Sequence, residues 1–241
     1  STLFPYTTLF RSARFGLKTT AAEKSGRSGE DVLLVAVTKL HTPAEINEAI
    51  DAGITDIGEN KVQEIIDKFD DVKPVKWHLI GHLQTNKVKY IIDKVSMIHS
   101  VDSLKLAKEI DKRAEQHGLT MDILIQVNSA LDERKFGVTT EETEELISQI
   151  LSACPNVRLK GLMCIAPYEE NPDDARPYFA AVRELYDKYS EEKNERMDFE
   201  FLSMGMTNDF QVAVEEGSNL IRVGTAILTW QIGRASCRER V

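Results

Sequence analysis

The chain has 241 residues, of which 42% are hydrophobic and 29% charged, and a formal net charge of −9, a composition typical of one large globular domain. This acidic balance argues against non-specific nucleic-acid binding, which needs a basic surface. The sequence has no apolar run of membrane-spanning length and no secretory signal pattern, so we expect a cytoplasmic protein with neither nucleic acid nor membrane among its partners.

The first strong element is the segment of residues 32–38, which begins with six consecutive apolar residues. Such a run is typical of a strand that is buried on both faces in a parallel sheet. A helix start follows, in which Thr42 can cap, Pro43 suits the first helical position and Glu45 completes a capping box. Lys39 is therefore expected where a buried strand meets the loop before a helix.

The same alternation continues along the chain. The expected strands are residues 32–38, 55–58, 77–80, 97–99, 122–127, 159–165, 199–203 and 220–223. The expected helices are residues 13–26, 43–52, 61–69, 86–93, 104–117, 140–153, 175–191 and 207–216, with Thr139 and Thr207 as caps of the last but two and of the last. This order favours an α/β fold, a single (β/α)8 TIM barrel. A doubly wound open sheet is the alternative, but no G-x-G-x-x-G motif follows the first strand.

The two ends of the chain look foreign to this domain. Residues 2–12 resemble the translation of a sequencing-library adapter, and residues 232–241 resemble the translation of its reverse complement. We therefore assign residues 1–12 and 231–241 to sequencing-adapter artefacts and expect the barrel to span residues 13–230. Without the three net positive charges of these ends the net charge is −12, and the two remaining cysteines, Cys154 and Cys164, are expected to be reduced.

Lys39 is the first candidate for chemistry. Barrels of this kind carry their active sites at the rim where the strands end and lead into helices. A lysine that is partly removed from water there loses its proton more readily and can form a Schiff base with an aldehyde. The alternative is an ordinary solvated lysine that closes a strand.

Two glycine-bearing segments follow the last two strands. Residues 203–208 contain Gly205, and residues 223–226 contain Gly224. Barrels often bind phosphate with these two loops, because glycine lets backbone N–H groups approach the anion. The hydroxyl groups of Ser203, Thr207 and Thr225 support this interpretation. The alternative is that both glycines only form tight turns.

Arg222 lies inside the last expected strand, between apolar neighbours. Because an unpaired buried charge is costly, it is expected either in a structural ion pair or as a donor to a bound ring or anion. The histidines are scattered by comparison. His78 and His82 are four residues apart, but a strand and a glycine turn lie between them, so we expect no metal site and no catalytic triad.

A Schiff-base lysine after the first strand and a phosphate site after the last two strands suit pyridoxal 5′-phosphate (PLP). The sequence resembles the YggS-like pyridoxal phosphate homeostasis proteins, whose barrel is similar to the N-terminal domain of alanine racemases. The segments that carry the resemblance are residues 36–39, 58–60, 77–87, 161–163, 202–206 and 221–227, within 32–228.

The resemblance implies a role for each part of the site. Lys39 would hold PLP as a Schiff base, Arg222 would face the pyridine nitrogen, and Asn60 would line the pocket near the ring. The phosphate would be bound largely by backbone N–H groups of the two loops. The cofactor-binding residues implied are Lys39, Asn60, Ser203, Gly205, Met206, Arg222, Gly224 and Thr225.

The function implied is intracellular PLP (vitamin B6) homeostasis without established turnover, with PLP-dependent apo-enzymes as acceptors and a monomer or weak homodimer as the assembly. Alanine racemases carry a second, β-rich domain that supplies a tyrosine base, and this sequence ends at the eighth strand. An arginine at the pyridine nitrogen also limits carbanion chemistry. A single-domain PLP-dependent amino-acid racemase is the alternative, and an aldolase that uses Lys39 without a cofactor is a third hypothesis.

Overall fold

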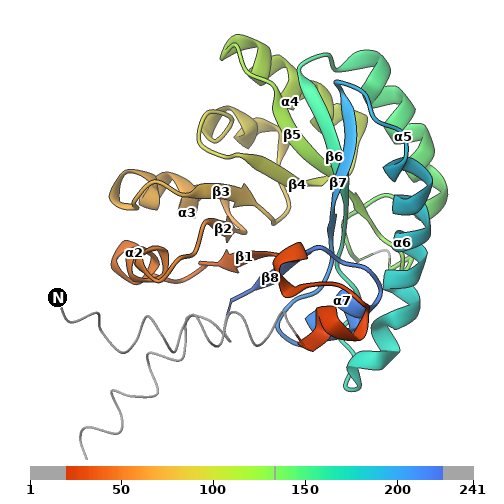
Figure 1. Ribbon diagram of the computed structural model, residues 1–241. Coiled ribbons are helices and arrows are strands. Elements are labelled where there is room, and N and C mark those ends of the chain that lie inside the picture. The colour runs from red at the N-terminus through yellow and green to blue at the C-terminus, as the bar shows by residue number, and fades with distance from the viewer. Residues whose placement is uncertain (1–19, 133, 225–241) are drawn as a thin grey trace, which may run out of the picture.

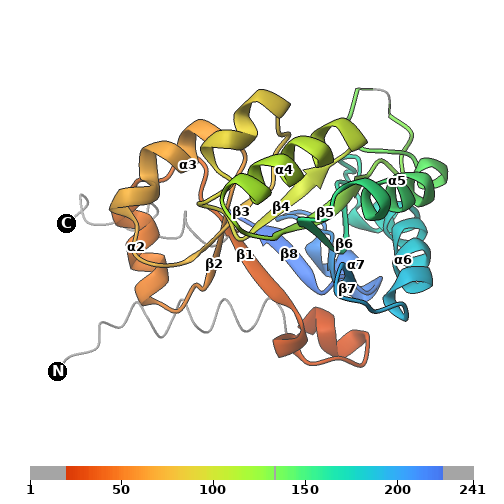
Figure 2. The same cartoon turned by 90° about the horizontal axis from the view of Figure 1, so that it is seen from above.

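The computed structural model describes residues 20–132 and 134–224. Within them, eight parallel strands pair in sequence order and close into a barrel where β8 meets β1 (Figures 1 and 2). The expected barrel is confirmed, and the expected strand ends agree with the observed ones to within two residues. The strands are β1 (Leu33–Val37), β2 (Asp56–Glu59), β3 (Lys76–Leu79), β4 (Met97–Val101), β5 (Met121–Val127), β6 (Val157–Cys164), β7 (Met197–Ser203) and β8 (Leu220–Val223).

The helices lie outside the barrel (Figure 2). The α-helices are α2 (Pro43–Asp51), α3 (Val62–Lys68), α4 (Leu104–Gln116), α5 (Thr140–Ala153), α6 (Arg176–Ser190) and α7 (Phe210–Glu215). The 3-10 helices are η1 (Gly29–Asp31), η2 (Phe69–Asp71), η3 (Thr85–Tyr90) and η4 (Pro172–Ala175). The α-helix expected over residues 86–93 is instead η3, which starts without a side-chain cap. Across the described ranges, no helix combines the length and apolarity needed to cross a membrane.

The expected segments at the chain ends are only partly described. Residues 20–24 are helical, and the earlier part of the expected leading helix lies outside the described residues. The two segments assigned to adapter sequence, 1–12 and 231–241, also lie outside them.

The capping boxes predicted for α2 and α5 are both present. Thr42 Oγ1 accepts from the Glu45 N–H while Glu45 Oε2 accepts from the Thr42 N–H, and Thr139 forms the same box at α5. The cap predicted at Thr207 is wrong. Residues 207–209 form a turn, and α7 begins at Phe210 with Asp209 as its N-cap, since the Asp209 carbonyl accepts from the Ala213 N–H at 3.0 Å.

The apolar core has two parts. The larger part packs the strands against the helices, with Phe179, Ile46 and Ile110 fully buried. A small second cluster is built from single side chains of β4, β5 and β6, namely Met97, Leu124 and Met163. Their neighbours along each strand belong to the larger part, so alternation places these three inside the barrel.

Strand β6 shifts its pairing register against both neighbouring strands near Gly161, which has φ +142°. A Cβ at this position would lie 1.8 Å from Phe201 O on β7, so only glycine allows the two strands to approach this closely. The shift sets which residues of β6 face the interior beyond this point.

Candidate functional site

Lys39 lies in a turn at the C-terminal rim of the barrel, directly after β1 and the buried Thr38. The Thr38 N–H donates to Gly58 O at 3.0 Å, so β1 stays attached to β2 up to this point. The next residue, Leu40, has φ +67° and is 90% exposed. The predicted rim position is confirmed. The predicted removal of the lysine from water is not found, because the turn leaves the side chain of Lys39 exposed.

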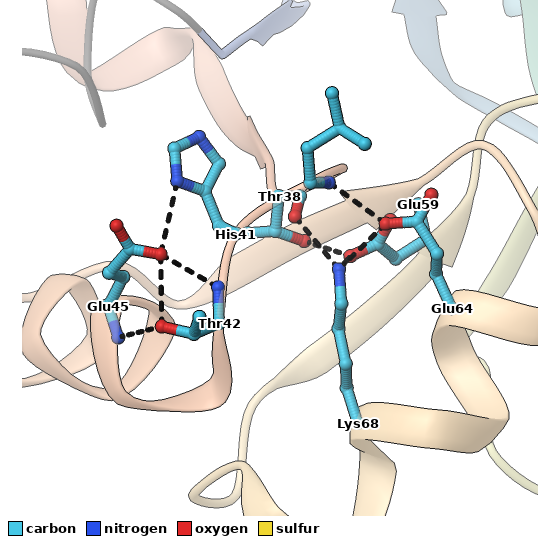
Figure 3. Close-up of polar contacts among 8 residues, drawn as sticks. Thr38, His41, Thr42, Glu45, Glu59, Glu64 and Lys68 are labelled. Carbon is cyan, nitrogen blue, oxygen red and sulfur yellow. Dashed lines mark hydrogen bonds and ion pairs between the residues drawn. The ribbon is translucent and has the colours of Figure 1, made fainter.

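A group of charged side chains between β2 and α3 holds the backbone before this lysine (Figure 3). Lys68 Nζ lies 2.8 Å from both Glu59 Oε1 and Glu64 Oε2, and we call these three residues the Lys68 cluster. Lys68 Nζ also donates to Thr38 O at 3.1 Å. Thr38 Oγ1 donates to Glu59 Oε1 at 2.7 Å. The Lys68 cluster therefore fixes both the carbonyl and the hydroxyl of the residue that precedes Lys39.

The Lys68 cluster also fixes the residue after the lysine. The Leu40 N–H donates to Glu64 Oε2 at 2.9 Å. Burial disfavours the Lys68 ammonium, but hydrogen bonds and charge from the two carboxylates outweigh it and raise the pKa of Lys68. The backbone of Lys39 is thus held on both sides by a charged cluster, while its side chain is exposed.

The two loops expected to bind phosphate lie next to each other, because the Arg222 N–H donates to Gly205 O at 3.0 Å. Gly205 has φ +93°, and a Cβ there would lie 2.8 Å from Phe210 Cα. N–H groups two residues apart along a strand point the same way, so the Gly224 N–H also faces the loop after β7. Within the described ranges, neither Gly205 nor Gly224 donates its N–H to another group. Two backbone amides are therefore available to an anion.

Met206 does not offer its amide in the same way. Its N–H donates to Asp209 Oδ1 at 2.6 Å. Burial raises the pKa of Asp209, and this hydrogen bond and the charge of Arg222 oppose that rise. A phosphate at the Met206 amide would therefore have to replace the Asp209 carboxylate. Thr225, the other residue expected here, lies outside the described residues.

Asn60 is half-buried at a bend directly after β2. A Cβ at Gly81 would lie 2.3 Å from Asn60 O, so the loops after β2 and β3 pack backbone against backbone. Asn60 lies on the same rim as Lys39, one strand further along. It lines a cavity with Lys61, Val62, Gln63, His82, Gln84 and Lys87.

Arg222 is buried inside the barrel, where its guanidinium donates to carbonyl and hydroxyl oxygens and not to a carboxylate. Its Nη1 donates to Ser203 O at 2.8 Å and to Ser203 Oγ, and its Nη2 donates to Cys164 O at 2.9 Å. No ion pair of Arg222 is found among the described residues, so of the two alternatives the structural ion pair is not observed. Burial lowers the pKa of Arg222 to about 10, which leaves it cationic at neutral pH.

Ser203 and Arg222 are joined inside the barrel by three residues to which the sequence analysis gave no role. These are Asp56, His78 and His99. Asp56 Oδ1 lies 2.9 Å from His78 Nε2, and His78 Nδ1 lies 2.9 Å from His99 Nε2. His99 Nδ1 in turn lies 3.2 Å from Ser203 Oγ. We call Asp56, His78, His99, Ser203 and Arg222 the interior network. The available signal was that His78 and His99 each stand beside outward-facing apolar residues of the same strand, which places both side chains inward.

The sequence of this chain is similar to those of known proteins. Residues 20–230 match the family model of the alanine racemase N-terminal domain. A pyridoxal phosphate homeostasis protein of Aquifex aeolicus is 45% identical over 209 residues, which cover 86% of this chain and 90% of that protein. A protein of the same name from Escherichia coli is 35% identical over 213 residues, which cover 86% of this chain and 89% of that protein.

Solved structures are similar to this chain as well. PipY of Synechococcus elongatus with PLP bound is 34% identical, with a TM-score of 0.75 over 86% of this chain and 99% of that one. An alanine racemase of Clostridium difficile has a TM-score of 0.63 over 90% of this chain and 56% of that one, but only 14% identity, so it shows similarity of fold alone.

Proposed function

This chain belongs to the pyridoxal phosphate homeostasis proteins, within the alanine racemase N-terminal domain family, and we propose that it binds PLP in the service of intracellular PLP (vitamin B6) homeostasis. The observation that carries the proposal is the similarity, over nearly the whole length of PipY, to a structure with PLP bound. The exposed Lys39 at the barrel rim and the amides of Gly205 and Gly224, which donate to no group within the described residues, support it.

The described residues suit three parts of the cofactor, which are its aldehyde, its phosphate and its ring nitrogen. PLP supplies an aldehyde that condenses with a lysine amine, and a ring that withdraws electrons. Lys39 is the anchor of the aldehyde, because its backbone is fixed while its amine is exposed. The N–H groups of Gly205 and Gly224 bind the phosphate, and an N–H of Arg222 donates to the ring nitrogen. The remaining proposed contacts are Asn60, Ser203, Met206 and Thr225.

We further propose that the protein holds and releases PLP rather than turning over a substrate. A guanidinium that donates to the ring nitrogen keeps that nitrogen unprotonated, which weakens the ring as an electron sink. The exposure of Lys39 leaves the anchor open to solvent and to a PLP-dependent apo-enzyme as acceptor. We propose a cytoplasmic protein that works as a monomer or weak homodimer.

The test is a borohydride experiment on the protein incubated with PLP. We expect an absorbance band that borohydride removes, with the pyridoxyl mass on Lys39 in peptide mapping. The Lys39→Ala variant should lose this adduct, while the matched rim variant Lys87→Ala should keep it. A protein that takes up no PLP, or a Lys39→Ala variant with the full adduct, would contradict the proposal.

Incubation with amino acids in deuterium oxide separates this proposal from the racemase alternative. A holding protein should exchange the α-hydrogen no faster than free PLP does. Exchange or racemisation at enzyme-like rates, about one turnover per second or faster, would identify a racemase instead.

A further inference from the structure

The interior network crosses the barrel from strand to strand, and we propose that Asp56, His78, His99 and Ser203 are positioning residues that fix Arg222 as a hydrogen-bond donor to the pyridine nitrogen of bound PLP. This inference rests on the proposed function. It goes beyond it because it assigns a role to three residues, Asp56, His78 and His99, that do not touch the cofactor.

The geometry of the interior network is continuous. Its five members come from five different strands, β2, β3, β4, β7 and β8, and none is more than 3% exposed. Each member is within hydrogen-bond distance of the next, and Thr55 Oγ1 donates to the second oxygen of Asp56 at 2.6 Å. No step of this path between Arg222 and Asp56 depends on water.

The protons of the interior network can be assigned from its two ends. Arginine has no acceptor, so Arg222 donates to Ser203 Oγ. At the other end the Asp56 carboxylate accepts from His78 Nε2. Burial alone would raise the pKa of Asp56, but hydrogen bonds from His78 and Thr55 outweigh it and lower the pKa, which keeps the carboxylate ionised.

The histidines between these ends are then fixed in one tautomer. Burial, together with nearby His78 and Arg222, lowers the pKa of His99 well below its ordinary value, so its ring is neutral and has one donor and one acceptor. With Ser203 donating to His99 Nδ1, His99 Nε2–H donates to His78 Nδ1. Every donor has an acceptor in this direction, and the cation and the anion lie at opposite ends.

The opposite direction leaves a group unsatisfied. If His99 carried its proton on Nδ1, Ser203 Oγ would accept from both His99 and Arg222. The Ser203 hydroxyl proton would then need another acceptor, and no hydrogen bond donated by this hydroxyl to any other group is found in the described part of the chain. A buried hydroxyl without a partner is costly, so the first direction is favoured.

The interior network determines what Arg222 can offer. Of the five N–H hydrogens of a guanidinium, three are used by Ser203 O, Ser203 Oγ and Cys164 O. Two hydrogens remain for a ligand, on a group whose plane is held by three bonds. Losing the Ser203–His99 link would free the Ser203 hydroxyl to rotate and so loosen the guanidinium at Nη1.

The interior network also occupies space that apolar side chains fill elsewhere in the same interior. Met97, Leu124 and Met163 form an apolar cluster there. Replacing a buried polar group by a well-packed apolar one is often neutral or stabilising, so stability does not require three polar residues beside this cluster. A requirement on the charge and orientation of Arg222 does explain them.

The first experiment uses the protein without cofactor, labelled with ¹⁵N in histidine. We expect NMR to show His99 neutral at pH 7 with its hydrogen on Nε2. A cationic His99, or a hydrogen on Nδ1, would overturn the inference. This measurement depends on no cofactor and no variant.

The second experiment loads the protein with PLP that carries ¹⁵N in the ring. In the wild type we expect the ring-nitrogen signal of an unprotonated, hydrogen-bonded pyridine. In His99→Leu we expect this signal to move toward that of free pyridine and the dissociation constant of PLP to rise about tenfold. His99→Gln can both accept and donate, so it should restore both values to within a few-fold of wild type.

Two further variants separate positioning from folding. Leu124→Ala removes interior volume without removing a hydrogen-bonding group of the interior network, and it should leave the ring-nitrogen signal unchanged even where stability falls. Ser203→Ala removes one atom, and with it both the link to His99 and one of the bonds that hold Arg222, and it serves if His99→Leu does not fold. PLP binding with an unchanged ring-nitrogen signal in Ser203→Ala or His99→Leu overturns this inference alone. Failure of the wild type to bind PLP overturns the proposed function and this inference with it.

Discussion

The two cationic side chains of the site are held in opposite ways. At Lys39 the Lys68 cluster grips the backbone from outside the barrel and leaves the side chain exposed. At Arg222 the interior network grips the side chain itself from inside the barrel and buries it. The Lys68 cluster consists of ionised side chains in contact with one another. In the interior network, neutral groups lie between the Arg222 cation and the Asp56 anion.

The difference follows from what each group has to do. An amine that forms and releases a covalent bond must move, so only its point of attachment is fixed. A donor that recognises a ring nitrogen must not move, since each rotatable bond that is ordered on binding lowers affinity. If the two arrangements are separate, a change in the Lys68 cluster should leave Arg222 undisturbed, and a change in the interior network should leave Lys39 undisturbed.

The largest expected effect on stability is at the Lys68 cluster. Lys68→Met leaves the buried Glu59 carboxylate without its cation, and we expect the free energy of unfolding to fall by about 3 kcal/mol in urea denaturation. The double variant Lys68→Met with Glu59→Gln should recover more than half of the loss. Equal instability of the single and double variants would show that the charge is not the cause.

A matched control exists on the surface. Lys73 pairs with Asp51 at 2.5 Å, with both side chains about half exposed. Lys73→Met should cost less than about 0.5 kcal/mol of unfolding free energy, because exposed ion pairs are weak.

The next effect is at Gly205, in the loop after β7 whose carbonyl accepts from the Arg222 N–H. Gly205→Ala adds a methyl group 2.8 Å from Phe210 Cα at φ +93°, and we expect a loss of about 2 kcal/mol of unfolding free energy together with weaker PLP binding. Gly118→Ala is the control, since it has φ +63° but nothing within 4 Å of the added group. A larger loss at Gly118 than at Gly205 would contradict the crowding argument.

The interior network predicts that the free energy of unfolding depends on pH. The pKa of Asp56 is lowered on folding, so its carboxylate stabilises the protein above its ordinary pKa and this contribution is lost as the pH falls through the folded value. Asp56→Asn should cost about 1 kcal/mol at neutral pH and flatten the fall of unfolding free energy in acid. Parallel acid curves for variant and wild type would show that Asp56 is not ionised in the folded protein.

The smallest effect concerns the helix start beyond Lys39. Thr42→Ala removes one half of a capping box, and we expect a loss of about 1 kcal/mol of unfolding free energy. Thr139→Ala at α5 should cost a similar amount. Neither variant should move the ring-nitrogen signal of bound PLP, and a shift in Thr42→Ala alone would show that the start of α2 is coupled to the interior network.

The parts of the molecule that follow from local sequence were predictable. The apolar run of β1, the rim position of Lys39 and the box at Thr42 each depend on neighbouring residues only. The cap at Thr207 was wrong for a local reason as well, because residues 207–209 form a turn in which Asp209 binds the Met206 amide, and Asp209 is the N-cap of α7.

The interior network could not be predicted from spacing. His99 and Ser203 are 104 positions apart, and their contact exists only because the barrel closes and both side chains face inward. The partners of Arg222 were also hidden, because two of them are backbone carbonyls, which no residue pattern marks. The role of Lys68 was hidden too, because its contacts with Glu59 and Thr38 O depend on how α3 packs against β2.

Gly161 shows how far the requirements of the site extend. It lies three residues before Cys164, whose carbonyl holds Arg222, and it keeps β6 in its shifted register because it lacks a methyl group. A variant at this position would misplace the carbonyl without altering any residue that contacts a ligand. Surveys of inherited or engineered variants that score only contact residues would therefore classify a damaging change at Gly161 as neutral.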